Sequence, residues 1–91
     1  MKLSDNIYLK NKDIAWRAID GSAYLVDSKG NALHELNEVG TRIWELIDGK
    51  KDQDDIVACI CDEFDAAKES VKKDLSIFLA EIQKKGLVKE K

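Results

Sequence analysis

The chain lacks the features that mark secreted, membrane-bound and metal-binding proteins. Its 91 residues include no proline, one histidine and two cysteines. No apolar run approaches the roughly 18 residues of a membrane-spanning helix, and the polar segment from Met1 to Lys12 is unlike a secretory signal. Cys59 and Cys61 would point about 200° apart on a helix, so they cannot hold one metal ion together. We therefore expect a cytoplasmic protein with no membrane partner, no metal and no cofactor.

Catalytic signatures and an excess of positive charge are missing as well. The chain has no Ser/His/Asp or Cys/His set with a plausible geometry, no Gly-rich phosphate loop and no paired carboxylates in an apolar setting. With 15 basic and 18 acidic residues its net charge is −3, which disfavours non-specific binding to nucleic acid. These absences argue against an enzyme and against a nucleic-acid partner.

The remaining features describe one folded domain, because 44% of the residues are apolar and no linker divides the chain. We expect an N-terminal arm over residues 1–12, in which Ile7 and Leu9 could form a short strand, and a single domain over residues 13–91. From residue 13 to Asn37 the sequence predicts a three-stranded antiparallel meander. The first turn is Asp20-Gly21, the second spans residues 27–31, and the third strand is Ala32–Leu36. The register places one set of side chains on the core face: Ile14, Trp16, Ala18, Ala23 and Leu25.

Three helices are predicted after the strands. Asn37 caps the first, which Gly49 ends and which carries an apolar side that includes a core Trp44. Asp52 caps the second, over residues 53–63. The third runs over residues 68–85 and stops at Gly86, with a stripe at helical spacing; Leu87 and Val88 then fold back or add a short strand. The stripe is Val71, Leu75, Phe78, Leu79 and Ile82. The expected fold is α+β and winged-helix-like.

Two sequence blocks resemble the PqqD-like family of small peptide-recognition domains. The first comprises Trp16-Arg17 before the hairpin glycine and the stretch Leu36–Gly49. The second is the third-helix pattern that begins at Val71 and ends at Gly86-Leu87-Val88. Together the blocks cover residues 14–88, and their order and spacing make the resemblance fairly specific.

The resemblance implies a non-catalytic protein that serves the biosynthesis of ribosomal peptide natural products. Members of this family bind the leader segment of a precursor peptide and present it to a modifying enzyme, often a radical S-adenosylmethionine (SAM) enzyme. The leader is expected to add as an extra strand on the open edge of the third strand, with its side chains in a groove beside the third helix. The expected partners are thus a leader peptide and a modifying enzyme.

The sequence is physically compatible with that mode, because the third strand of a meander has one unpaired edge. On the third helix, Ile77 falls roughly 100° off Phe78 and could remain exposed on a docking surface. The predicted peptide-binding residues are Ala32, Leu33, His34, Glu35, Leu36, Val71, Asp74, Leu75, Ile77 and Phe78.

Simpler interpretations stay open for single residues and for the whole chain. His34 can be an ordinary strand residue, and Asp74 can pair with Lys73 instead of a peptide. A winged-helix DNA-binding regulator would need a basic recognition helix, but the lysines of the third helix are interleaved with acids. A carrier protein would need a serine opening a helix, whereas Ser70 and Ser76 lie within one. The open edge is compatible with a monomer or a homodimer.

Overall fold

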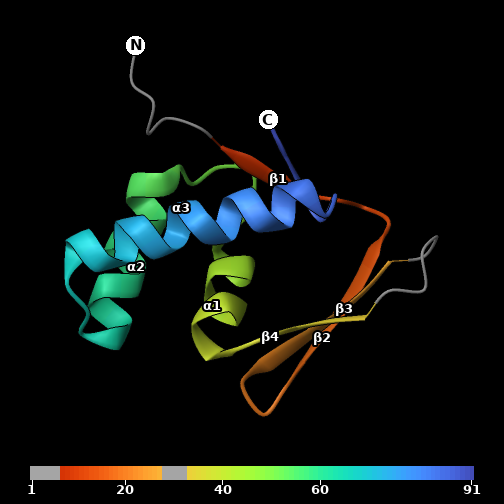
Figure 1. Cartoon of the computed structure of the whole chain (residues 1–91), viewed down its shortest axis with the longest axis horizontal. Helices are drawn as coiled ribbons and strands as arrows, with labels where there is room; N and C mark the ends of the chain where they lie inside the picture. The colour runs from red at the N-terminus through yellow and green to blue at the C-terminus, as the bar shows by residue number, and fades with distance from the viewer. Residues whose placement is uncertain (1–6, 28–32) are drawn as a thin grey trace.

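A computed structural model describes residues 7–27 and 33–91. The order is β1 (Tyr8–Lys10), β2 (Ile14–Ile19), β3 (Ser22–Asp27), β4 (Leu33–Leu36), α1 (Glu38–Leu46), α2 (Gln53–Phe64), α3 (Lys68–Lys84) and β5 (Val88–Glu90). Strands β2, β3 and β4 form the predicted antiparallel meander, and α1 lies under α3 between α2 and this sheet (Figure 1). The α+β prediction is confirmed. Within the described ranges, no helix is both long enough and apolar enough to cross a membrane.

The turn between β2 and β3 sets the register that the sequence predicted. Asp20 and Gly21 have φ values of +52° and +84°, as a tight hairpin turn requires. Trp16 consequently pairs with Leu25, and Ala18 pairs with Ala23. Asp27, the first residue of the second predicted turn, ends β3, whereas residues 28–31 of that turn and Ala32 lie outside the described residues.

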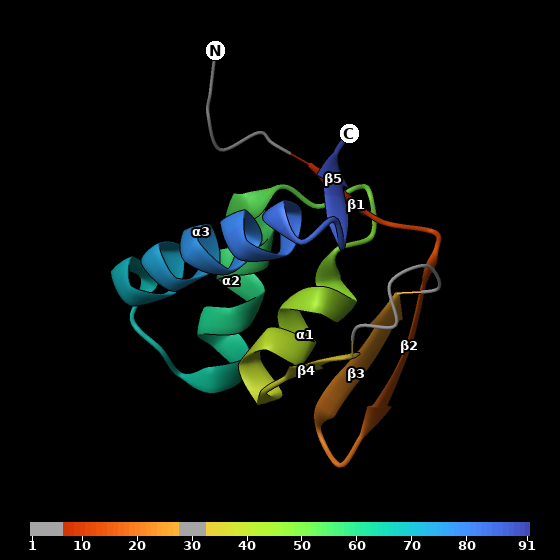
Figure 2. The ribbon, with the colours of Figure 1, turned by 45° about the vertical axis from the view of Figure 1, so that its right-hand side comes forward.

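The predicted core face of the sheet is only partly correct. Ala23 and Leu25 of β3 are fully buried and Ile14 is 8% exposed, but Ala18 is exposed and Trp16 is 39% exposed. The reason is that α1 packs against β3 and β4, so β2 extends beyond the covering helix (Figure 2). The Trp16 ring meets the fully buried Trp44 edge-on, with ring centroids 6.1 Å apart. Trp44 is a core residue as predicted, whereas Trp16 lies at the border of the core and contacts Trp44 from the solvent side.

Helices α1 and α2 begin where their capping residues predicted. Asn37 Oδ1 accepts a 2.8 Å hydrogen bond from the Gly40 N–H, and Asp52 forms a capping box with Asp55. Helix α1 ends at Leu46, earlier than expected; Gly49, with a φ of +81°, turns the chain after it. Helix α3 ends at Lys84, next to the predicted end.

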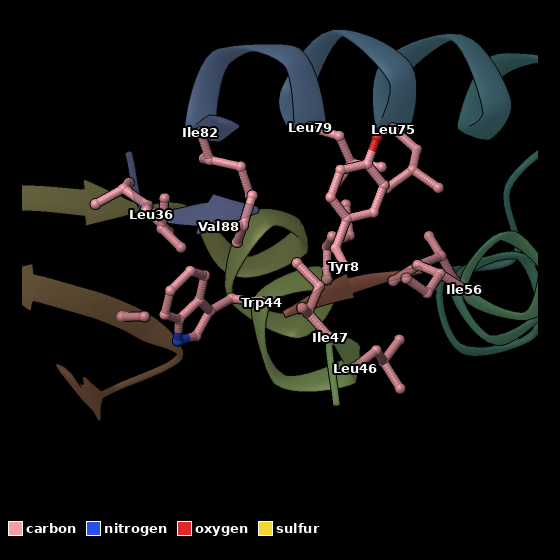
Figure 3. Close-up of a cluster of buried hydrophobic side chains, with 14 of the residues drawn as sticks. Tyr8, Leu36, Trp44, Leu46, Ile47, Ile56, Leu75, Leu79, Ile82 and Val88 are labelled. Atoms are coloured by element: carbon pink, nitrogen blue, oxygen red, sulfur yellow. The ribbon is translucent and has the colours of Figure 1, made fainter. Parts of the chain in front are cut away.

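The short strand that Ile7 and Leu9 suggested is formed by β1, which pairs antiparallel with β5. Ile7 also bridges Asp52, and Tyr8 is 6% exposed. Figure 3 shows Tyr8 reaching from β1 toward Leu75 and Leu79 of α3. The two ends of the described chain thus close one side of the core.

Candidate functional site

The outer edge of β4 is an open sheet edge. In the described part of the chain β4 pairs with β3 alone, from the pair Ala23–Leu36 to the pair Val26–Leu33. In an antiparallel pair the backbone groups of alternate residues point away from the partner strand. The edge therefore presents free N–H and C=O groups to an incoming strand.

A groove of about 380 Å³ runs between β4 and the C-terminal half of α3. Residues 33–36 of β4 form one wall. The α3 wall consists of residues spaced three or four apart along one helix face, and the chain after α3 closes one end. The lining residues are Leu33, His34, Glu35, Leu36, Asn37, Phe78, Glu81, Ile82, Lys85 and Leu87.

Local backbone geometry fixes the two ends of this groove. At one end the Asn37 cap turns the chain from β4 into α1, and the Phe78 ring packs on Gly40: a Cβ at position 40 would lie 3.3 Å from Phe78 Cε1. At the other end Gly86, with a φ of +77°, reverses the chain after α3. Leu87 then folds back, and its N–H donates a 2.9 Å hydrogen bond to Ile82 O.

The groove combines an apolar floor with charges of both signs. Leu36 is 8% exposed and Phe78 is half-buried, so both support the floor. Glu81 of α3 and Lys85, the C-cap of this helix, line the groove one helical turn apart, and Glu35 lines it from β4. Neither Glu81 nor Lys85 makes an ion pair with another residue of the described ranges. Their charges are therefore free to meet a ligand.

The ion pairs of the described residues lie outside the groove. Arg42 of α1 makes a bidentate contact with Glu63 of α2, at 2.7 and 2.9 Å, and this guanidinium lowers the pKa of Glu63. Lys51 Nζ, 2.8 Å from Asp48 Oδ2, similarly holds the pKa of Asp48 well below its usual range. These pairs connect helices and a loop, and neither borders the groove.

The structure brings together half of the predicted binding residues. Leu33, His34, Glu35, Leu36 and Phe78 line one groove, as the interpretation requires. The other predicted residues have different positions. Leu75 is 1% exposed in the core, Ile77 is 52% exposed outside the groove, Val71 and Asp74 line a second hollow, and Ala32 lies outside the described residues.

Five groove residues were absent from the sequence prediction. Glu81 and Lys85 follow Phe78 at helical spacing, and this signal could have identified them. Leu87 could not be found in this way, because its position depends on the chain reversal at Gly86. The full set is Asn37, Glu81, Ile82, Lys85 and Leu87.

Comparison with known proteins gives one family match and one similar solved structure. A family model, Coenzyme PQQ synthesis protein D (PqqD), matches residues 22–88, a span that includes β4, α3 and the whole groove. The solved structure of TbiB1 in complex with the TbiA(beta) leader peptide is also similar. It shares 29% sequence identity, with 88% of this chain and 93% of that chain covered and a TM-score of 0.81. No curated protein matches the chain. The family resemblance predicted from the sequence is confirmed.

Proposed function

The chain belongs to the PqqD family, and we propose that it binds the leader segment of a ribosomally synthesised precursor peptide by strand addition and presents it to a modifying enzyme. The observation that carries this proposal is the open edge of β4 beside the groove under α3. The similar protein TbiB1 forms a complex with a leader peptide, which supports the same role here.

Strand addition divides the binding energy into two parts. Hydrogen bonds to the β4 backbone hold an extended peptide whatever its sequence, and the groove selects among its side chains. Alternate side chains of an added strand point to opposite faces of the sheet. One set therefore enters the groove, while the other set points to the opposite face of the sheet.

The lining of the groove determines which side chains it favours. Phe78 and Leu36 offer apolar contact for one peptide side chain. Lys85 and Glu81 can each pair with an opposite charge and thereby fix the register of the peptide. The preferred leader thus combines an apolar anchor with at least one charged residue.

The proposed role is recognition, so the chemistry belongs to a partner. We infer a peptide-modifying enzyme in the same cytoplasmic compartment, with a radical SAM enzyme as the first candidate because such enzymes act in the pathway that names the family. The bound leader would be held at β4 while the rest of the precursor reaches that enzyme. Binding to β4 occupies the open edge and also prevents two copies of the chain from pairing through it.

The test is a ¹H–¹⁵N titration of the protein with the leader peptide encoded by the nearest small open reading frame. We expect chemical-shift changes concentrated at Leu33–Leu36 and at Phe78, Glu81 and Lys85. A scrambled peptide of the same composition is the control, because it keeps the charge and loses the pattern. Shifts confined to other surfaces, or equal shifts with both peptides, would contradict strand addition at β4.

A further inference from the structure

A second hollow, of about 250 Å³, lies where the start of α1, the end of α2 and the first half of α3 meet. Its walls are mostly apolar. Val39 is 37% exposed at its rim although it is apolar, and Phe64 is half-buried. The complete lining is Val39, Ile43, Ile60, Phe64, Ala66, Ala67, Ser70, Val71 and Asp74.

The second hollow continues the line of the groove along α3. Asp74 stands one helical turn before Phe78, and Val71 one turn before Asp74, so all three lie on one helix face. The Phe78 ring rests on Gly40, the neighbour of Val39 in α1. Phe78 therefore forms the ridge between the two depressions. A peptide added to β4 would meet this ridge if it continued past Leu36, and the second hollow lies on the far side.

The charge of the second hollow selects its occupant. Asp74 supplies the one charged side chain of the lining. Within residues 7–27 and 33–91 its carboxylate has no ion pair. An apolar cup with an exposed carboxylate at its rim fits an apolar side chain next to a lysine or arginine.

We propose that this hollow is a second subsite for the same peptide, which takes an apolar residue flanked by a basic residue just outside the strand-forming segment. The inference rests on the proposed function, since it is the strand added at β4 that directs the peptide across Phe78. The second subsite adds specificity beyond the groove. Backbone hydrogen bonds between β4 and the peptide supply affinity, and the subsite requires a particular pair of peptide residues at a fixed distance from the added strand.

The experiment starts from a random peptide library displayed on phage and selected on the full chain. We expect the enriched peptides to share an apolar residue beside Lys or Arg, at constant spacing from an extended segment. For one such peptide, Asp74→Lys should weaken binding about two- to fivefold, the range of an exposed ion pair. Val39→Asp should weaken it about tenfold or more, because it places a charge against the apolar side chain.

A matched control and a compensating change separate recognition from folding. Asp62→Lys makes the same charge change on an exposed position of α2 outside both depressions and should leave affinity unchanged. A peptide in which the basic residue is replaced by Glu should bind Asp74→Lys better than it binds the unmodified chain. A merely structural role of Asp74 cannot produce this reversal.

The outcomes distinguish the subsite from the proposed function. Enriched peptides that perturb β4 amides but are indifferent to both Asp74→Lys and Val39→Asp would overturn the second subsite and leave strand addition standing. Failure to enrich any peptide, or enriched peptides that leave the β4 amides unperturbed, would overturn both. Sensitivity to both substitutions with rescue by the Glu peptide is the result that we expect.

Discussion

The Thr41 hydroxyl of α1 accepts a 2.7 Å hydrogen bond from the backbone N–H of Ala23 in β3. Thr41 is 5% exposed, and its hydroxyl also donates to Leu36 O in β4, at 3.3 Å. Ala23 and Leu36 are paired across the two strands, so one side chain joins α1 to the end of this ladder. The contact sets the position of β4, and with it one wall of the groove.

Replacing Thr41 with Val should destabilise the fold by about 1–3 kcal/mol, because the buried Ala23 N–H loses its acceptor. Urea denaturation measures the cost, and amide hydrogen exchange at Ala23 locates it. Thr41→Ser retains the hydroxyl and should keep Ala23 protected from exchange. Equal protection of Ala23 in the Val and Ser variants would disprove this function of Thr41.

Two glycines with similar backbone angles should differ in their tolerance of alanine. Gly21 and Gly49 have φ values of +84° and +81°, so a side chain at either costs about 1–2 kcal/mol in backbone strain. A Cβ at position 21 meets open space, whereas one at position 49 would lie 2.6 Å from Leu9 Cδ2. Gly49→Ala should therefore destabilise the fold more than Gly21→Ala. In a Leu9→Ala background the excess should disappear, and its persistence would refute the clash.

Two exposed carboxylates should contribute to the decrease in the free energy of unfolding at acidic pH. The pKa values of Glu63 and Asp48 lie below their usual range because of Arg42 and Lys51. Their contribution to stability is present above the unfolded-state pKa of about 4 and is lost as the pH falls through the lower folded-state values. In the variants Glu63→Gln and Asp48→Asn, the free energy of unfolding should decrease less as the pH falls below about 4.

Salt and a matched variant test the same claim. Asp62→Asn removes an exposed carboxylate that has no ion pair within the described residues, so it should leave the decrease in stability at acidic pH unchanged. High salt should reduce the difference between the unmodified chain and Glu63→Gln, since screening weakens exposed pairs. If neither Glu63→Gln nor Asp48→Asn changes the pH dependence of stability, these carboxylates are not its cause.

Phe78 and Ile77 are adjacent in α3 and should differ sharply in peptide binding. Phe78 lines the groove, whereas Ile77 is 52% exposed and lines neither depression. Phe78→Ala should weaken leader binding about tenfold or more through lost apolar contact, and Ile77→Ala should leave it unchanged. Titration calorimetry of both variants gives the comparison. A larger loss from Ile77→Ala would restore the docking surface that the sequence suggested and displace the groove.

The sequence predicted local features better than the extent of packing. Asn37, Asp52 and the Asp20-Gly21 turn were correctly placed because their geometry depends on neighbouring residues alone. Trp16 was wrong as a core residue, although its register was right. Alternation shows which side chains share a face, but it does not show how far a covering helix reaches.

The candidate site was predictable on the strand and less so on the helix. Leu33–Leu36 follow from the topology, since the third strand of a meander has an open edge. On α3 the periodic stripe did not separate buried Leu75 from Phe78, which borders the groove. Glu81 and Lys85 were not among the predicted binding residues, because only the approach of β4 makes their side of the helix a wall of the groove.

An N-methyl scan tests whether a leader peptide adds to β4 as a strand. Methylation of one backbone nitrogen at a time, along the leader of the nearest small open reading frame, removes single hydrogen-bond donors and keeps the side chains. We expect a period of two: loss of binding at alternate residues that face β4, and tolerance at those between them. Uniform tolerance, or losses that follow a helical period, would contradict strand addition.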